Sequence, residues 1–285
     1  MILITGATGN NGRELVRQLA AAGQHVRALV RNPAKAAELK DPNVELAVGD
    51  FDQPATLDAA LRGVEKAFLL TPVAEHFVEW QRAFIEAAQR AEVKHLVKFS
   101  GMGADSNVKA ELLRLHNETD NLLRKSGVPF TILQPNSFHQ NILSSADTIK
   151  TQGAFYWPLK NAAQSTVDIR DVNAIAARVF TSPGHEGNTY VITGPEALTF
   201  QQAAEKLSAV LGRDIQYVDV PLSAAADGMR KSGMPEWNVH AVSELLGYFA
   251  SGAAAAVTDS VPRLLGRPAI SFEQFVQDHR AAFLP

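Results

Sequence analysis

The sequence contains no cysteine among its 285 residues. This absence excludes a disulfide-stabilised scaffold, a thiolate nucleophile and any cysteine-ligated metal. Long hydrophobic runs are missing too, since none reaches the roughly 18 residues that a membrane-spanning helix needs. The chain begins directly on a short apolar segment without a charged leader. We therefore expect a cytoplasmic protein that makes no membrane contact.

The chain also has little excess of charge of either sign. The 27 Lys and Arg against 30 Asp and Glu give a net charge of −3, and the cationic residues are dispersed. No basic stripe for nucleic acid is present, so we expect no nucleic-acid partner. The eight histidines show no His-Glu-x-x-His spacing, and no Gly-x-Ser-x-Gly elbow is found. The sequence thus predicts neither a metal site nor a serine nucleophile.

Short apolar runs alternate with amphipathic stretches through the first half of the chain. This alternation predicts βαβ units, a parallel sheet and a doubly wound Rossmann-type α/β fold. The expected strands cover residues 1–5, 25–30, 44–48, 66–70, 95–100 and 130–134. The expected helices cover residues 14–22, 33–39, 55–61, 75–91 and 109–126.

Beyond residue 134 the pattern loosens. We expect the Rossmann domain to cover residues 1–150, with sheet additions from about 165 to 195, and a smaller, mainly helical substrate lobe at 196–285. The expected sheet additions are 166–169 and 189–192, with a helix at 172–180 between them. In the lobe we expect a strand at 215–220 and helices at 200–211, 224–232, 238–250 and 272–283.

A glycine-rich turn joins the first expected strand to the first helix. Gly6 permits a sharp turn, Gly9 lets backbone amides approach a diphosphate, and Gly12 lets the helix pack close to the strand. The helix N-terminus then offers free N–H groups to an anion. The alternative is a glycine-rich turn without a ligand. The cofactor contacts predicted here are Gly6, Thr8, Gly9, Asn10, Asn11 and Gly12.

The end of the second strand indicates which dinucleotide binds. An NAD site usually places Asp or Glu there for the ribose hydroxyls, but residues 15–37 contain no acidic residue. Arg31 ends the strand instead, and Lys35 follows one helical turn later. A guanidinium suits a 2′-phosphate, so the sequence favours NADP(H). The alternative is that both are solvated surface cations.

Two further strand ends should face the cofactor. Asp50 and Phe51 follow the third strand, where the carboxylate would accept a hydrogen bond from adenine and the ring would flank it. The alternative is an aspartate that caps the next helix. After the fourth strand, Leu70, Thr71 and Pro72 are expected to form an apolar wall beside the cofactor.

Several segments together resemble a known family. They are ITGATGNNG, VRNPAK, VGDFDQPATLDAAL, KSGVPFTILQPNSFHQN, VDIRDV and SFEQFVQDHRAAF. The chain resembles the NmrA-like branch of the atypical short-chain dehydrogenase/reductases, and within it bacterial NADPH-dependent quinone and triphenylmethane-dye reductases. The resemblance implies a Rossmann domain, a small C-terminal lobe and a substrate cleft between them. The family also includes regulators that bind the dinucleotide.

One departure from typical short-chain dehydrogenases concerns the acid/base pair. Those enzymes carry Tyr-x-x-x-Lys on one helix, whereas the expected helix at 109–126 has no tyrosine. The spacing occurs once, from Tyr156 to Lys160, with Pro158 between them. Alcohol–ketone chemistry therefore loses support. Hydride transfer to quinones or dyes needs no strong acid, so we expect an NADPH-dependent reductase of quinone-like or other conjugated acceptors.

The resemblance and the positions of the strand ends indicate which residues contact the cofactor and the substrate. Ser100, Gly101, Asn136 and Phe138 are expected beside the cofactor. Met102, His116, Phe138 and Asn141 are expected to contact substrate, with His116 as the candidate catalytic residue. The alternatives are a core methionine, a helix-surface histidine and a core phenylalanine.

Two other functions compete with the reductase hypothesis. One is a non-catalytic redox sensor that binds NADP(H) and changes its protein contacts. The other is reduction or isomerisation of a specific metabolite with His116 as the acid. A second copy of the chain, in a homodimer, is a further candidate partner.

Overall fold

The computed structural model describes residues 1–284. The chain forms two compact units, each assembled from segments that are separated in the sequence. Unit 1 contains residues 1–106, 115–134 and 172–190, and unit 2 contains 107–114, 135–171 and the chain from 191 onward. The domain boundaries expected from the sequence stay a prediction.

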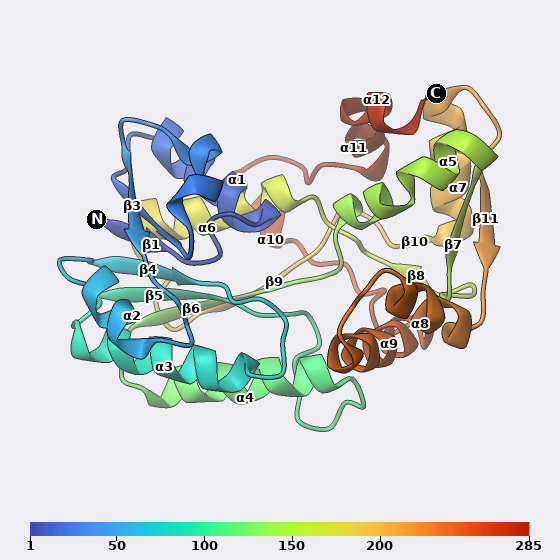
Figure 1. The fold of residues 1–285 in the computed structure, drawn as a ribbon. Coiled ribbons are helices and arrows are strands. Elements are labelled where there is room, and N and C mark those ends of the chain that lie inside the picture. Colours follow the sequence, from blue (N-terminus) through green and yellow to red (C-terminus); the bar gives the residue numbers. More distant parts are fainter. Residues whose placement is uncertain (285) are drawn as a thin grey trace. The chain divides into compact units, whose positions relative to one another are not determined.

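A seven-stranded parallel sheet forms the centre of unit 1 (Figure 1). Its order is β3-β2-β1-β4-β5-β6-β9. This order confirms the predicted Rossmann-type fold, and it reverses direction between β1 and β4, where such sheets bind ligands. The strands are β1 (Ile2–Ile4), β2 (Val26–Val30), β3 (Val44–Val48), β4 (Lys66–Leu69), β5 (His95–Phe99), β6 (Phe130–Pro135) and β9 (Thr189–Ile192).

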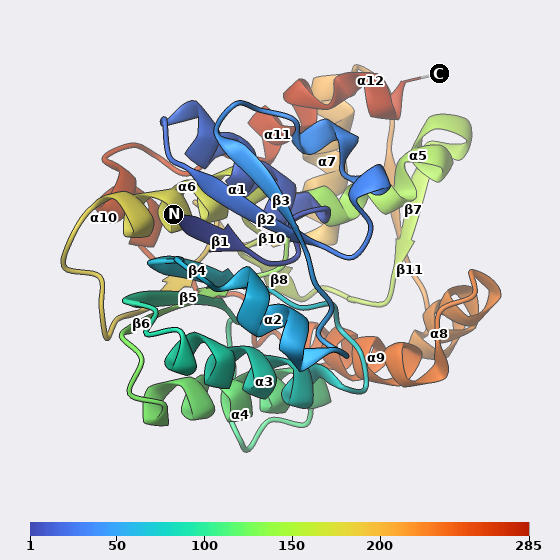
Figure 2. The same cartoon turned by 60° about the vertical axis from the view of Figure 1, so that its left-hand side comes forward.

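Helices cover both faces of this sheet (Figures 1 and 2). On one face lie α1 (Asn10–Ala21) and α6 (Ile169–Thr181), joined by a 3.2 Å hydrogen bond from Asn173 Nδ2 to Asn11 Oδ1. On the other lie α2 (Pro54–Ala60), α3 (Phe77–Arg90) and α4 (Glu111–Lys125). Fully buried side chains such as Leu3, Leu57, Phe84 and Leu96 form the core between the layers. Apolar burial of this kind is the main force that holds the layers together.

Unit 2 is mainly helical. Its short strands pair as β7 with β11, in parallel, and β8 with β10, antiparallel. Its strands are β7 (Ala154–Trp157), β8 (Ala163–Gln164), β10 (Leu198–Thr199) and β11 (Gln216–Asp219). Its helices are η3 (His139–Ser145), α5 (Ala146–Gln152), α7 (Phe200–Leu211), α8 (Leu222–Lys231), α9 (Glu236–Ala250), α10 (Ser260–Leu265), α11 (Phe272–Asp278) and α12 (Arg280–Phe283).

Three expected elements differ in the structure. Residues 166–169 add no strand to the sheet, and Val167 makes only an isolated bridge to Phe138. The reason is that Asp168 Oδ1 accepts the N–H of Arg170 at 2.8 Å, which starts helix α6 at Ile169. The helix expected at 33–39 is two one-turn 3₁₀ helices, 33–35 and 37–39. The last expected helix is interrupted at His279, which separates α11 from α12.

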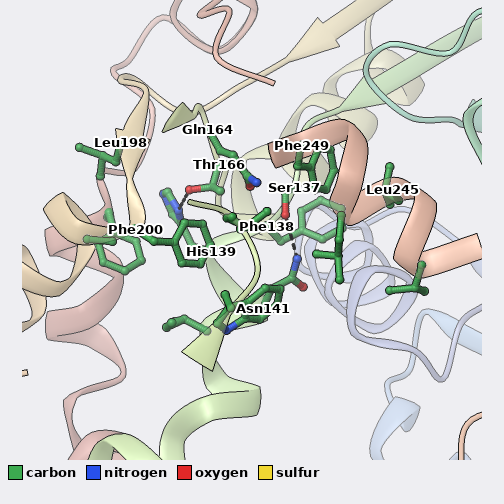
Figure 3. A pocket seen from close by; sticks show the side chains of 17 residues that line it. Ser137, Phe138, His139, Asn141, Gln164, Thr166, Leu198, Phe200, Leu245 and Phe249 are labelled. Carbon is green, nitrogen blue, oxygen red and sulfur yellow. Dashed lines mark hydrogen bonds between the residues drawn. The ribbon is translucent and has the colours of Figure 1, made fainter. Parts of the chain in front are cut away.

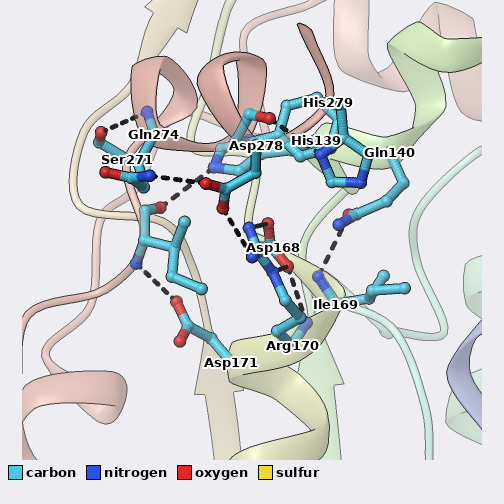
Figure 4. A network of polar contacts seen from close by, with 12 residues as sticks. His139, Gln140, Asp168, Ile169, Arg170, Asp171, Ser271, Gln274, Asp278 and His279 are labelled. Carbon is cyan, nitrogen blue, oxygen red and sulfur yellow. Dashed lines mark hydrogen bonds and ion pairs between the residues drawn. The ribbon is translucent and has the colours of Figure 1, made fainter. Parts of the chain in front are cut away.

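An ionic network in unit 2 is centred on the buried carboxylate of Asp168 (Figure 4). Arg170 binds both oxygens of Asp168, at 2.9 and 2.8 Å, and reaches Asp278 at 2.7 Å. Although burial acts to raise it, the hydrogen bonds from Arg170 hold the pKa of Asp168 below its ordinary value. Asp171 accepts the N–H of Ile270 at 2.7 Å. The network therefore joins the VDIRDV segment to the C-terminal SFEQFVQD segment.

Candidate functional site

The glycine turn of unit 1 is anchored on strand β4. The Thr5 hydroxyl accepts the N–H of Leu70 at 2.8 Å and lies 2.9 Å from the Leu70 carbonyl oxygen. Gly6 adopts a φ of 62°, which favours glycine. A Cβ atom at Gly12 would lie 2.2 Å from the Gly6 carbonyl oxygen, so only glycine fits where the helix crosses the turn.

The first turn of α1 has free backbone donors. Gly9 is the N-cap and provides no side-chain hydrogen bond. The N–H groups of Asn10, Asn11 and Gly12 therefore have no acceptor within the helix. Free donors at the positive end of a helix dipole are suited to a phosphate or diphosphate.

A pocket of about 140 Å³ lies beside this turn, and it collects several residues predicted from the sequence. Arg31 lines it, and its exposed side chain makes no ion pair or hydrogen bond with the other residues that the structure describes. The Lys35 side chain is also exposed, although it is outside the pocket lining. The lining residues are Gly6, Thr8, Leu29, Val30, Arg31, Gly49, Asp50, Phe51, Asp52, Pro72 and Trp80.

One wall of this pocket is aromatic. The rings of Phe51 and Trp80 lie 6.2 Å apart, and Trp80 Nε1 donates to Asp52 Oδ1 at 2.7 Å. Asp50 does not cap α2, because the N-cap is Gln53 and no side chain caps that helix, so the capping alternative is wrong. No sequence pattern places Trp80 at this pocket, because the side chain reaches it from α3, about thirty residues further along the chain.

A polar cluster that no sequence pattern indicates lies at the end of β5. Lys98 Nζ donates to Asp120 Oδ1 at 2.6 Å, and both side chains are almost completely buried. Ser100 and Gln134 donate to Asp120 Oδ2 at 2.9 and 3.1 Å. Burial lowers the pKa of Lys98, and Asp120 opposes that shift. Ser100 therefore has a contact inside the protein, while its role beside a cofactor stays a prediction.

His116 lies one helical turn before Asp120 on α4. It is only 9% exposed, so the alternative of a helix-surface histidine is wrong. Its ring meets Phe77 edge-on at 4.9 Å, and Nδ1 has no hydrogen-bond partner among the described atoms. Burial, and then the charge of Lys98, hold the pKa of His116 well below its ordinary value. The imidazole is therefore neutral near pH 7, and its catalytic role stays a prediction.

The remaining positions from the cofactor and substrate predictions have varied surroundings. Gly101 and Met102 are half-buried in the loop after β5. Thr71 is buried and accepts a hydrogen bond from Gln81 Nε2 at 3.1 Å. Leu70 packs against Gly6, where a Cβ atom would lie 3.0 Å from the Leu70 carbonyl oxygen. The contacts of these residues with cofactor or substrate stay predictions.

The single Tyr-x-x-x-Lys spacing does not form a helical pair. Tyr156 is exposed on strand β7, and its hydroxyl donates to Gln152 Oε1 at 2.9 Å. Lys160 follows the strand with a φ of 50°. The two side chains therefore do not share a helix face.

Unit 2 contains an apolar pocket of about 260 Å³ (Figure 3). Phe138 and Asn141, both predicted to contact substrate, line it. Asn136 does not line it. Its amide donates to Ser165 Oγ and to the Ala254 carbonyl, at 2.8 Å each, so its predicted cofactor contact stays a prediction. The lining residues are Ser137, Phe138, His139, Asn141, Ile142, Trp157, Leu159, Gln164, Thr166, Leu198, Phe200, Ala203, Val242, Leu245, Leu246, Phe249 and Phe272.

One side-chain group in unit 2 has metal-ligating atoms within 4.8 Å of one another: Glu111, His240 and Glu244. Glu244 Oε2 accepts the N–H of Glu111 at 2.7 Å and thereby caps α4. Arg114 lies 3.9 Å from the same carboxylate oxygen. Because helix capping and a nearby cation account for Glu244, this group does not indicate a metal site.

Within residues 1–284, no helix is both long enough and apolar enough to cross a membrane.

The chain is similar to several known proteins along nearly its whole length. The chain is similar to an NAD(P)H azoreductase of Xenophilus azovorans, with 42% identity over 99% of both chains. It is also similar to a (4-alkanoyl-5-oxo-2,5-dihydrofuran-3-yl)methyl phosphate reductase of Streptomyces griseus, with 37% identity over 100% of both. Among solved structures, the NADPH complex of an Escherichia coli NADPH-dependent quinone oxidoreductase has a TM-score of 0.89 at 28% identity, covering 98% of this chain and 100% of that one.

A family model described as the NmrA-like family matches residues 1–261. This match confirms the family that the sequence segments indicate. The chain belongs to the NmrA-like family.

Proposed function

We propose that this chain, which is an NAD(P)H-dependent oxidoreductase, uses NADP(H) to reduce a quinone-like or other conjugated acceptor. The observation that carries the proposal is the pairing of an uncapped α1 N-terminus with a pocket that contains an unpaired Arg31. Relatives named as azoreductase, furanone phosphate reductase and quinone oxidoreductase support it.

The residues of unit 1 fit the parts of this cofactor. The first-turn amides of α1 would hold the diphosphate, and Arg31 would bind the 2′-phosphate. Phe51 and Trp80 would flank the adenine ring. When bound, NADPH supplies a hydride; the acceptor takes up this hydride and one proton, and NADP⁺ is released.

The chemistry of a conjugated acceptor suits the acid/base groups that we describe. His116 is neutral near pH 7, which makes it a weak proton donor. Reduction of a quinone places negative charge on an oxygen that the ring stabilises, so a proton from water suffices. Binding and orientation of the acceptor then supply most of the catalysis.

The cofactor assignment predicts a selective effect of Arg31→Ala. Loss of a charge-assisted contact to the 2′-phosphate should weaken NADPH on the order of 10- to 100-fold and leave NADH nearly unchanged. Calorimetric titration with both coenzymes measures this difference. Lys40→Ala, at another exposed cation, is the matched control. Equal weakening of both coenzymes by Arg31→Ala would contradict the contact with the 2′-phosphate, and no weakening of either would show that Arg31 is only a surface cation.

The acceptor class is tested by a panel of quinones, azo dyes and simple ketones. We expect the absorbance of NADPH to fall with conjugated acceptors and to stay constant with simple ketones. Measurable NADPH binding without oxidation by any acceptor would favour a non-catalytic sensor instead.

We keep a homodimer and a cytoplasmic location as predictions, which sedimentation and cell fractionation would test.

A further inference from the structure

The pocket of unit 2 has no permanent charge. Its 17 lining residues include no Asp, Glu, Lys or Arg. His139 is its one imidazole, and burial lowers the pKa of His139 to about 4, so the ring is neutral near pH 7. Aromatic and aliphatic side chains such as Phe138, Trp157, Phe200 and Phe249 form most of the wall. An apolar pocket of about 150 Å³ holds a benzene ring, so about 260 Å³ admits one ring or two fused rings.

Most polar side chains of the pocket already have partners. His139 Nε2 lies 3.2 Å from the Ile270 carbonyl oxygen, which makes it a donor, and Nδ1 accepts from Thr166 at 2.9 Å. Asn141 Nδ2 donates to Ser137 Oγ at 3.0 Å. Trp157 Nε1 donates to Ser145 Oγ at 3.1 Å. These groups are held in place by contacts within the protein.

Gln164 is different. Its side chain is 98% buried on strand β8, yet its Nε2 has no hydrogen-bond partner among the described residues. Figure 3 shows the end of this side chain turned toward Ser137 and Phe249. A buried N–H donor without a partner is costly, and most such donors in proteins are satisfied by protein, water or ligand. The Gln164 amide therefore offers a hydrogen bond into an otherwise apolar space.

We propose that this pocket binds an uncharged aromatic acceptor and that Gln164 Nε2 donates a hydrogen bond to its carbonyl oxygen. The identification of the ligand as an electron acceptor rests on the proposed function. The pocket selects against charged acceptors, because an ionised group would lose its hydration with no opposite charge among the lining residues. It selects for a ligand with a hydrogen-bond acceptor such as a carbonyl oxygen, because a ligand without one leaves the amide unsatisfied.

The test measures binding through Trp157, whose fluorescence reports on the pocket. We would titrate 1,4-naphthoquinone, naphthalene and 1,4-naphthoquinone-2-sulfonate into the protein with NADP⁺ present, so that no turnover occurs. Trp157→Phe identifies the part of the quenching that comes from this pocket. Gln164→Met keeps the side-chain length and removes the donor, and Gln201→Met, at an exposed position on α7, is the matched control.

We expect saturable quenching by 1,4-naphthoquinone, and the part of it that comes from Trp157 should be lost in Trp157→Phe, which keeps the other two tryptophans of the chain. Gln164→Met should raise the dissociation constant of the quinone on the order of 5- to 100-fold and that of naphthalene less than about twofold. The sulfonate should bind wild-type protein at least about tenfold more weakly than the parent quinone. This comparison needs no variant, so it remains decisive if Gln164→Met fails to fold.

The proposal is overturned if Gln164→Met weakens quinone and naphthalene equally, if the sulfonate binds as well as the quinone, or if Trp157→Phe leaves the saturable quenching unchanged. Failure of the proposed function looks different. In that case the quinone still quenches Trp157, but no acceptor oxidises NADPH. Conversely, NADPH oxidation by quinones with an unchanged KM in Gln164→Met rejects the role of Gln164 and retains the reductase.

Discussion

Replacement of Lys98 by methionine is expected to lower the free energy of unfolding by about 3–5 kcal/mol. Methionine matches the length of the lysine side chain but leaves the carboxylate of Asp120 buried without its cation. Removal of one partner from a buried ion pair has an effect of this size, because the remaining charge has lost its hydration. Urea unfolding followed by circular dichroism measures the change.

Two variants make this expectation specific. Arg90→Met breaks an ion pair to Asp58 that is about half exposed, and it should cost less than about 1 kcal/mol. The double variant Lys98→Met/Asp120→Asn also removes the charge of the Asp120 carboxylate, and the asparagine keeps an acceptor for Ser100 and Gln134. It should recover most of the lost stability. Equal losses in Lys98→Met and Arg90→Met would contradict the importance of burial.

Replacement of Gly12 by alanine is expected to weaken both the fold and NADPH binding. Its Cβ atom would lie 2.2 Å from the backbone oxygen of Gly6, so the start of α1 must move away from the turn. Such overpacking costs about 1–3 kcal/mol of stability. Because the same movement displaces the first-turn amides, we expect NADPH affinity to fall by at least about tenfold.

Two other glycines provide controls in the same assays. At Gly9 the nearest atom to a new Cβ is 3.4 Å away, so Gly9→Ala should change the free energy of unfolding little while hindering the approach of a diphosphate. At Gly228, inside helix α8, nothing lies within 4 Å. Gly228→Ala should therefore leave NADPH binding unchanged and stabilise the helix by up to about 1 kcal/mol. A Gly12→Ala variant with normal stability and affinity would contradict the close crossing.

Part of the candidate site could be predicted because its signals are local. Gly6, Gly9 and Gly12 lie within one turn between a strand and a helix, and Arg31 ends the next strand. Neighbours in such a motif are fixed by chain geometry over a few residues. The structure assembles Gly6, Arg31, Asp50 and Pro72 around one pocket, while the lysine at position 35 lies outside its lining.

Other parts of the structure could not be predicted, because no pattern of neighbouring residues indicates them. Lys98 occupies a buried strand position, and nothing in the sequence indicated that Asp120, 22 residues later, would neutralise it. Gln164 is one polar residue in a segment whose pairing, with β10, is also distant in the chain. The expected strand at 166–169 was wrong because Asp168 caps the start of α6 through its side chain.

The sequence by itself determined the order of strands and helices through residue 134, the parallel sheet, the glycine turn and the family of the chain. These follow from hydrophobic periodicity and glycine placement, which act over short stretches of chain. Only the tertiary structure decided the partners of Lys98, the burial and neutrality of His116, and the uncharged pocket around Gln164. Burial and pKa depend on which distant segments exclude water from a group, and that property belongs to the packed fold.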